Sequence, residues 1–451
     1  MVMATSRDTE HALVGGVCAG IASRYEYPVP AVRAATVALS VATAGLGSLA
    51  YLALWKRLPA GKTVEADTTT EDDGVVELSE PIEVTDTPPV ALSDIEESTT
   101  PLAPTTSEQL RAGGAATPMR AAAATSAPPS IESLYGPVSA DLPLVREAIG
   151  EVARGVGFDF LERMLEQQLA STGKLMRPAI ALLGGQLGSY NLDRIVPLAA
   201  SVELLHTATL VHDDVIDEAD QRRGNDTANS LFGNSASVML GDYMFANSAD
   251  LIARTDNIQV VQNFAATLMM IVRGELNQDV TVFEYSEDVQ RYLDRIIGKT
   301  ASLFATAAEN GALVCDAPTD QVAAMREYGM KLGIAFQIID DVLDFTGDPE
   351  VMGKPAVGSD LRGGTLTLPA ILYMQAEPDD NPIKRAFDGQ RRHANLDRAI
   401  ADILAGPYIT ETIETAHRFG REARTALEPL PAGETRDTLA ALVDYVLDRD
   451  S

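Results

Sequence analysis

LLHTATLVHDDVID at residues 204–217 and IAFQIIDDVLD at residues 334–344 are the two stretches that decide the fold. Each is an apolar run that ends in three aspartates with the spacing i, i+1, i+4. On a helix, the first and third aspartates of such a set share a face. The runs therefore predict two long apolar helices, each with carboxylates at its end. The first triplet is Asp213, Asp214 and Asp217, and the second triplet is Asp340, Asp341 and Asp344.

Carboxylates packed this closely repel one another and disfavour their own burial. A bound cation compensates that cost, and an all-oxygen ligand set that can share phosphate oxygens favours Mg²⁺. A single triplet is usually only a solvated acidic helix end. Two equal triplets, each after an apolar run, indicate a metal site with all six aspartates as candidate ligands.

Basic residues accompany both triplets within a strongly acidic chain. Guanidinium and ammonium groups around a metal site suit a polyphosphate better than a neutral substrate. The sequence therefore predicts an anionic, phosphate-bearing substrate. The basic set is Lys174, Arg177, Arg222, Arg223, Lys299 and Lys354.

The C-terminal part of the chain reads as helical almost throughout. Apolar residues recur at three- and four-residue spacing, and breakers such as Gly224 and Pro318 separate the runs. No run shows the β-branched alternation of a strand. These patterns predict an all-α bundle with helices over 142–154, 158–170, 194–217, 237–253, 257–277, 286–310 and 320–345.

Residues 61–130 have a different composition. They contain 13 acidic and three basic residues, eight prolines, and no Phe, Trp or Tyr. Such a segment cannot bury enough apolar surface to offset its ordering entropy. We therefore expect three parts: a small module at 1–60, an acidic disordered linker at 61–130, and a large domain at 131–451.

Charge and cysteine content exclude several classes of protein. Asp and Glu number 65 against 35 Lys and Arg, for a net charge of −30, which argues against nucleic-acid binding. A bound divalent metal can still invert the local charge for an anionic substrate. The two cysteines, Cys18 and Cys315, make no disulfide framework and fit a reducing compartment.

The N-terminal module contains 22 residues without a charge, at 34–55. As a helix this run is about 33 Å long, enough to cross a hydrocarbon layer of about 30 Å. Tyr51 and Trp55, followed by Lys56 and Arg57, indicate an interfacial anchor. A buried helix of a small soluble domain is the alternative, and it is helped by Gly45 and Gly47.

Residues 7–60 resemble the PspC family of small bacterial membrane domains. The match rests on GVCAGIA at 16–22, Val32-Arg33, and then Gly47, Tyr51, Trp55 and Pro59. The resemblance implies association with membrane lipid and no catalysis in this module.

Residues 134–451 resemble the trans-polyprenyl diphosphate synthases. The anchors are GKLMRP at 173–178, His206 and both triplets with their flanks, RRG at 222–224, GDY at 241–243, GELNQ at 274–278, GKT at 298–300 and Gly353-Lys354. The family implies an all-α isoprenoid-synthase fold with a deep central cavity and dependence on Mg²⁺. It also implies head-to-tail condensation of isopentenyl diphosphate with an allylic diphosphate, a homodimer, and a catalytic domain on the cytoplasmic side of the membrane.

The resemblance also implies a role for each site residue. The six aspartates hold about three Mg²⁺ ions on the allylic diphosphate. Three cations neutralise that diphosphate as it leaves, four residues hold isopentenyl diphosphate, and two polar side chains face the reacting carbons. The cations at the allylic diphosphate are Arg222, Lys299 and Lys354. The residues that hold isopentenyl diphosphate are Lys174, Arg177, His206 and Arg223. The polar side chains at the reacting carbons are Thr300 and Gln337.

Two positions depart from the family pattern. Leu175 stands where an arginine is frequent, and Thr365 replaces the usual lysine in GTLT at 364–367. The second departure removes one diphosphate contact, which leaves a catalytically weak, membrane-tethered regulatory subunit or scaffold as an alternative. A terpene cyclase is a further alternative, although cyclases usually replace the second triplet with an Asn/Ser/Glu pattern.

The product is expected to be of medium to long chain length. Ala208 and Thr209, one turn before the first triplet, are small and form the first possible floor for the growing chain. Leu204, Leu205, Met269 and Met270 are the candidates for a deeper floor.

Overall fold

The computed structural model describes residues 7–8, 60–61, 134–154, 156–170, 173–222, 224–347, 356–379 and 381–449. The apolar run at 34–55 and nearly all of the linker at 61–130 lie outside these residues. Two short strands, β1 (Arg7–Asp8) and β2 (Ala60–Gly61), pair in parallel, with Arg7 opposite Ala60. The chain divides into two units, and every described helix belongs to the second, Thr99–Ser451.

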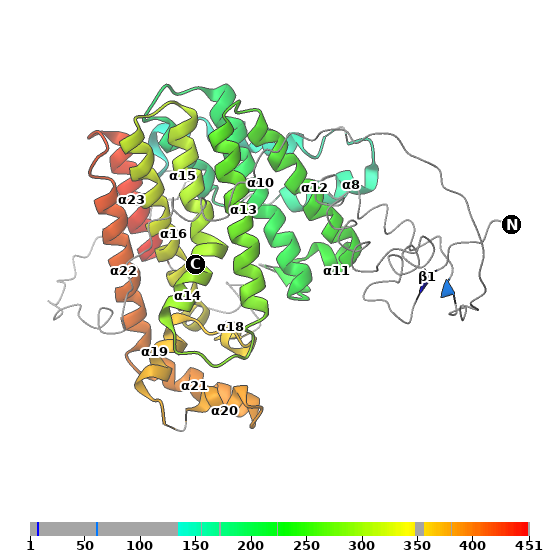
Figure 1. Cartoon of the computed structure of the whole chain (residues 1–451), viewed down its shortest axis with the longest axis vertical. Helices are drawn as coiled ribbons and strands as arrows, with labels where there is room; N and C mark the ends of the chain where they lie inside the picture. Colours follow the sequence, from blue (N-terminus) through cyan, green and yellow to red (C-terminus); the bar gives the residue numbers. More distant parts are fainter. Residues whose placement is uncertain are drawn as a thin grey trace, which may run out of the picture. The chain divides into compact units, whose positions relative to one another are not determined.

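The second unit is an α-helical bundle, as the periodicity predicts (Figure 1). Its elements are η1 (Gly136–Val138), α7 (Leu142–Glu151), α8 (Asp159–Leu169), α9 (Met176–Gly185), α10 (Leu192–Ile216), β3 (Gln221–Arg222), β4 (Asn225–Asp226), α11 (Ala228–Phe232), α12 (Asn234–Ala253), α13 (Ile258–Asp279), α14 (Val289–Ile296), the π-helical segment η2 (Ile297–Ala301), α15 (Ser302–Val314), α16 (Thr319–Thr346), α18 (Ser359–Arg362), α19 (Leu368–Ala376), α20 (Pro382–Phe387), α21 (Arg392–Ala405), α22 (Tyr408–Ala426) and α23 (Glu434–Asp448).

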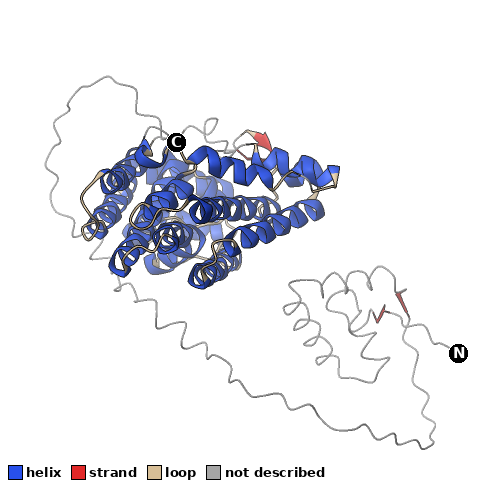
Figure 2. Cartoon of the chain, turned by 90° about the horizontal axis from the view of Figure 1, so that it is seen from above, coloured by secondary structure: helices blue, strands red, loops and turns tan. Residues whose placement is uncertain are grey.

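The two triplet helices, α10 and α16, lie at the centre of the packing. Helix α10 packs against α12 and α9, and α16 packs against α15 and α22. Figure 2 shows several of these helices nearly end-on. Along α10 the buried residues surround the helix, which places it inside the protein rather than on its surface. Among the described residues it is also the helix that is long and apolar enough to cross a membrane, but burial in this bundle accounts for its composition.

Local sequence explains where these helices begin. Asn191 and Asn257 cap α10 and α13, and each side chain accepts a hydrogen bond from the backbone two residues on. Such caps satisfy amide groups that have no partner within the helix. Both helices begin within two residues of the starts predicted at 194 and 257.

Two glycines bring the π-helical segment η2 close to its neighbours. A Cβ atom on Gly333 of α16 would lie 2.6 Å from the Cα of Ala301, and one on Gly274 of α13 would lie 3.0 Å from the amide nitrogen of Lys299. Either contact is too short for a side chain. Glycine at both positions therefore allows Lys299 and Thr300 to lie between α13 and α16.

Two details differ from the sequence-based expectation. The single helix expected at 286–310 is three elements: α14 begins at Val289 behind the Asp288 cap, η2 interrupts the α-helical pattern, and α15 ends at Val314. A π-helical turn inside a helix is frequent at functional sites. The segment after the first triplet also forms a small antiparallel hairpin, β3–β4, that alternation did not predict.

Candidate active site

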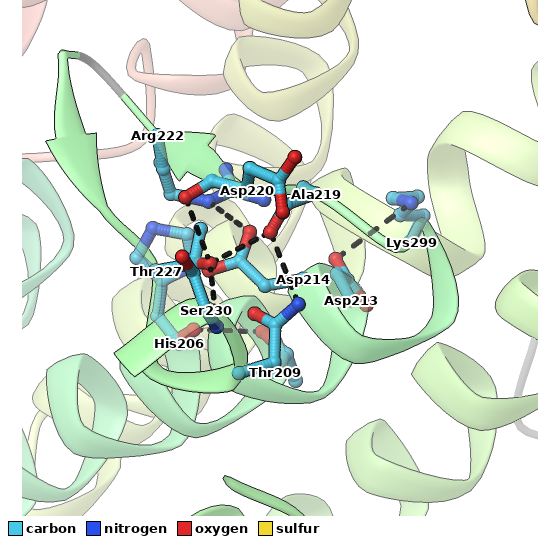
Figure 3. Close-up of polar contacts among 11 residues, drawn as sticks. His206, Thr209, Asp213, Asp214, Ala219, Asp220, Arg222, Thr227, Ser230 and Lys299 are labelled. Carbon is cyan, nitrogen blue, oxygen red and sulfur yellow. Dashed lines mark hydrogen bonds and ion pairs between the residues drawn. The ribbon is translucent and has the colours of Figure 1, made fainter. Parts of the chain in front are cut away.

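The first triplet lies at the C-terminal end of α10, where the helix dipole disfavours negative charge. Asp213 is half-buried and Asp217 is exposed, but Asp214 is only 3% exposed. The Asp214 Oδ1 atom accepts a hydrogen bond of 2.7 Å from Nε of Arg222 (Figure 3). We call buried aspartates of this kind inward and the more exposed ones outward. The inward Asp214 is thus paired with a protein cation, whereas the outward Asp213 and Asp217 share the helix face predicted from their spacing.

The β3–β4 hairpin positions Arg222. Thr227 donates a hydrogen bond of 2.6 Å to the carbonyl oxygen of Ala219, and the Asn229 amide donates to the same oxygen across 3.0 Å. Gly224, with φ of 77°, makes the turn. These contacts fix the short loop that returns Arg222 to the end of α10.

Lys299 of η2 joins the first triplet to α13. Its Nζ atom lies 2.8 Å from Oε1 of Glu275 and 3.8 Å from Oδ2 of Asp213. Figure 3 shows Lys299 and Asp213 facing each other. The sequence assigned Lys299 to this site but gave Glu275 no role. Its place in GELNQ was the signal that could have identified it.

Burial raises the pKa of Asp213 to about 7, an effect that Lys299 opposes and the carboxylates of Glu275 and Asp217 reinforce. The pKa of Asp214 is also raised by burial, although Arg222 counteracts part of this rise. Burial lowers the pKa of Lys299, but Asp213 and Glu275 more than offset that effect, and the net shift is upward. The surroundings of Asp213 and Asp214 thus disfavour their ionised forms, as expected of carboxylates whose charge a bound cation would stabilise.

In the second triplet, two aspartates point inward. Asp341 and Asp344 are each 3% exposed. Asp341 accepts hydrogen bonds from Nε2 of Gln337 at 2.9 Å and from the Tyr292 hydroxyl at 2.7 Å. Asp344 accepts hydrogen bonds from the side chain of Ser359 at 2.8 Å and the backbone amide of residue 360 at 3.2 Å.

The third member, Asp340, has a 37% exposed side chain and pairs with Arg449, the residue that follows α23. Each triplet therefore contains at least one inward carboxylate, which is buried and hydrogen-bonded to the protein, and at least one outward carboxylate, which stays partly exposed. The outward group is Asp213, Asp217 and Asp340, and the inward group is Asp214, Asp341 and Asp344.

A chain of hydrogen bonds extends from η2 to α14 through Asp341. The Thr300 hydroxyl donates to Oε1 of Gln337 across 2.7 Å, and Gln337 in turn donates to Asp341, which also accepts from Tyr292. Burial raises the pKa of Asp341 to about 7, the carboxylate of Asp360 adds to the rise, and the Tyr292 and Gln337 hydrogen bonds oppose it. Thr300 and Gln337 are thus hydrogen-bonded to each other, and Tyr292 was not among the residues that the sequence predicted.

The residues expected to bind isopentenyl diphosphate are only partly described. The Arg177 guanidinium lies 4.4 Å from the centre of the Phe304 ring, and Nζ of Lys174 lies 5.6 Å from that of Tyr445. His206 is half-buried on α10, two turns before the first triplet. Arg223 and Lys354 lie outside the described residues, so their predicted roles remain predictions.

The two departures from the family pattern are also visible. Leu175 adopts a left-handed backbone with φ of 49°, which is unusual for a branched residue, and it lies between Lys174 and Arg177. Arg295 of α14 donates a hydrogen bond of 2.6 Å to the carbonyl oxygen of Leu366, next to Thr365. A guanidinium therefore lies near the position where the sequence lacks the usual lysine.

A cleft with about 440 Å³ of empty space, including its opening to solvent, lies beside the second triplet. Gln278, Tyr292, Arg295 and Thr365 are among its lining residues. Tyr292 connects this cleft to the triplet, because its hydroxyl donates a hydrogen bond to Asp341.

The His212 side chain packs against α12 rather than facing the aspartates of the first triplet. Its Nε2 atom lies 3.0 Å from the carbonyl oxygen of Val238, and its ring packs against Phe245. A Cβ atom on Gly241 would lie 2.1 Å from Nε2 of His212, so the glycine leaves room for the ring. This packing agrees with leaving His212 out of the predicted site.

The donor set fits a hard divalent cation that retains other ligands. Among the described residues, no three acidic, His or Cys side chains converge closely enough to enclose a metal ion. Mg²⁺ is typically held by one or two carboxylates together with water and substrate phosphate oxygens. Outward carboxylates at the ends of two long helices suit that mode of binding.

Comparison with known proteins gives two matching families. The model of the polyprenyl synthetase family matches residues 158–403, and that of the PspC domain matches residues 4–61. A prenyl transferase from Synechocystis is 39% identical over 324 residues, which are 71% of this chain and 99% of the relative.

Two solved structures share the fold of the large domain. A decaprenyl diphosphate synthase from Rhodobacter capsulatus is 36% identical with a TM-score of 0.66, covering 71% of this chain and 99% of that one. A polyprenyl synthase from Caulobacter crescentus, complexed with calcium and isoprenyl diphosphate, is 33% identical with a TM-score of 0.66 and covers 71% and 98%.

Proposed function

The chain belongs to the polyprenyl synthetase family, and we propose that it joins isopentenyl diphosphate head-to-tail to an allylic diphosphate in a Mg²⁺-dependent reaction. The observation that carries this proposal is the pair of aspartate triplets, each with outward carboxylates, together with Lys299 beside Asp213. The product is a trans-polyprenyl diphosphate of medium to long chain length.

We assign direct metal contact to the outward carboxylates, Asp213, Asp217 and Asp340. The Caulobacter relative, complexed with calcium and isoprenyl diphosphate, supports a divalent cation beside a diphosphate. About three Mg²⁺ ions would supply charge neutralisation of the allylic diphosphate when bound. The inward aspartates would orient the basic and polar side chains around that site.

The first step breaks the C–O bond of the allylic diphosphate and creates a diphosphate anion and an allylic cation together. Lys299 and Arg222, with Lys354, would neutralise the departing anion. Lys299 is suited to this task because Glu275 fixes its ammonium group within 3.8 Å of Asp213. Arg295 is a further cation beside Thr365, where the usual lysine is missing.

In the second step the double bond of isopentenyl diphosphate attacks the cation and forms the new C–C bond. Lys174, Arg177, His206 and Arg223 would hold its diphosphate, and the oxygens of Thr300 and Gln337 would face the positive carbons. The resulting cation loses a proton, which restores a double bond, and the departed diphosphate accepts that proton. Apolar walls would keep water from the cation.

An assay with purified protein tests the reaction. The full chain in detergent is incubated with isopentenyl diphosphate, one allylic diphosphate and Mg²⁺, and product length is determined by chromatography. Elongated prenyl diphosphates support the proposal. No product would favour the regulatory-subunit alternative, and a cyclic hydrocarbon would favour the terpene cyclase.

We also propose that the domain forms a homodimer through α13. Met269, Val272, Leu276 and Val280 follow one face of α13 at helical spacing, and all are between 48% and 75% exposed. A row of exposed apolar side chains of this kind is typical of a protein interface. Light scattering of the purified protein should give twice the mass of one chain, and Leu276→Glu should give monomer.

The N-terminal module gives the enzyme its proposed location. The PspC match at 4–61 contains the charge-free run at 34–55, which supports association with membrane lipid. We place boundaries at 60 and 130, with the acidic segment 61–130 as a linker to the catalytic domain. We further propose that this domain lies on the cytoplasmic side.

A further inference from the structure

Arg449 links the end of the chain to the second triplet. It follows α23 directly and contacts Asp340, 109 residues earlier. The same Nη2 atom donates a hydrogen bond of 2.7 Å to the carbonyl oxygen of Phe336, one turn before Asp340. The guanidinium also lies 3.8 Å from the centre of the Phe336 ring. Asp340 and the side chain and backbone of Phe336 therefore hold a single guanidinium at the end of α16.

This arginine is more deeply buried than its place at a chain end requires. Its side chain is 7% exposed, and its Nε atom has no hydrogen-bond partner among the described residues. Burial of a guanidinium with an unpaired nitrogen costs free energy, which pairing with a carboxylate offsets. Asp340 provides that carboxylate, and Asp340 is also the outward member of the second triplet.

We propose that Arg449 is a positioning residue, the internal counter-ion of Asp340 in the metal-free protein, and that a divalent cation at Asp340 displaces it. This inference rests on the metal role proposed for Asp340. The inward carboxylates already have protein donors, so Arg449 supplies the positive charge that the outward carboxylate needs before metal binds. It orients Asp340 at the end of α16.

Displacement follows from electrostatics. A guanidinium and a divalent ion on one carboxylate repel each other, so each weakens the binding of the other. An ion pair that is partly exposed stabilises by about 1 kcal/mol or less, and its removal should tighten metal binding by up to about fivefold. Metal binding should also release the end of α23, since Arg449 then loses its charged partner.

Mn²⁺ affinity without substrate tests the proposal. The full-length protein in detergent is titrated with Mn²⁺, and the bound ion is followed by electron paramagnetic resonance. Arg449→Ala should bind Mn²⁺ about two- to fivefold more tightly than wild type. Arg424→Ala is the matched control, because Arg424 pairs with Asp444 of α23 on the surface, away from the triplet. It should leave the affinity unchanged.

Whether Arg449→Ala raises or lowers Mn²⁺ affinity distinguishes the counter-ion role of Arg449 from a merely structural role. Loss of a structural contact would loosen the site, so weaker or unchanged Mn²⁺ binding in Arg449→Ala would overturn the proposal. Asp340→Asn separates it from the proposed function: unchanged Mn²⁺ binding there would remove the metal assignment itself. If Asp340→Asn weakens binding but Arg449→Ala does not tighten it, only the counter-ion role fails.

Hydrogen exchange of the wild-type protein gives a test without substitutions. Saturating Mn²⁺ should speed amide exchange in the last turn of α23, at residues 445–448, and leave α22 unchanged. Slower or unaltered exchange in that turn would show that Arg449 stays in place when metal binds, which contradicts the proposal.

Discussion

The Tyr292 hydroxyl donates a hydrogen bond of 2.7 Å to Oδ2 of Asp341, and both side chains are buried. This contact joins α14 to the end of α16 and gives the inward carboxylate a donor from a second helix. With Gln337 on the other oxygen, Asp341 has a protein partner on each side. Its role is therefore to hold Tyr292, Gln337 and Thr300 in one arrangement.

Removal of this hydroxyl should destabilise the protein and impair the site. Tyr292→Phe leaves a buried carboxylate oxygen without its donor, at a cost of about 1–3 kcal/mol in the free energy of unfolding. Urea unfolding measures the loss, and kcat should fall as well. Tyr285→Phe is the matched control, since Tyr285 donates to the exposed Glu287. A Tyr292→Phe protein as stable as this control would contradict the account.

The raised pKa of Asp341 predicts how stability depends on pH. Because its pKa is about 7 in the folded state and 3.8 in its reference state, the folded protein holds this proton more tightly. Unfolding therefore becomes easier as pH rises from about 4 to about 7, and the penalty is complete above the folded pKa. In EDTA, Tm of wild type should fall between pH 5 and 8 by more than Tm of Asp341→Asn. Equal pH profiles would show that Asp341 does not titrate in this range.

Product length should depend on Ala208. This residue is fully buried on α10, one turn before the first triplet. Ala208→Phe should shorten the product while the first condensation continues, because the ring fills volume without contacting the metal ligands. Thr207→Phe, on another face of the helix, is the control and should leave the length unchanged. An unaltered product distribution in Ala208→Phe would show that the growing chain does not pass this residue.

Removal of residues 1–60 should release the protein from membranes without ending catalysis. The charge-free run at 34–55 is the part of the chain predicted to insert, and the acidic segment 61–130 is predicted to be an extended linker that couples the two domains weakly. Membrane fractionation of the full chain and the truncated chain tests this. Full-length protein found wholly in the soluble fraction would contradict the membrane assignment.

The sequence predicted the architecture well where a pattern is local and repeated. The starts of α10 and α13 followed from apolar periodicity, and α16 lies within one residue of its predicted range at both ends. The interruption at η2 was not predictable in this way, because it depends on packing against Gly274 and Gly333 from two other helices. Local propensity does not contain that information.

The sequence names candidate members of the site, which stay predictions, but it does not distinguish the positions of their side chains. The spacing i, i+1, i+4 identified all six aspartates, yet only the structure distinguishes Asp214, Asp341 and Asp344 as inward. Tyr292 and Arg449 were missed because local spacing carries no information on contacts between distant parts of the chain. Tyr292 is 49 residues from Asp341, and Arg449 is 109 residues from Asp340. Met269, one of several residues considered for a deeper floor of the product tunnel, is 56% exposed on α13, which argues against that role.

Turnover of the Asp213→Ala and Asp340→Ala variants tests whether the two aspartate triplets hold the metal. Both variants remove an outward carboxylate, which relieves like-charge repulsion within the triplet. Asp340→Ala also leaves the buried guanidinium of Arg449 without its carboxylate, so we expect only Asp213→Ala to be at least as stable as wild type without metal. At saturating Mg²⁺, with isopentenyl and allylic diphosphates, kcat should fall by about a thousandfold in each, while circular dichroism stays unchanged. Wild-type turnover in either variant would contradict the assignment of these residues to the metal.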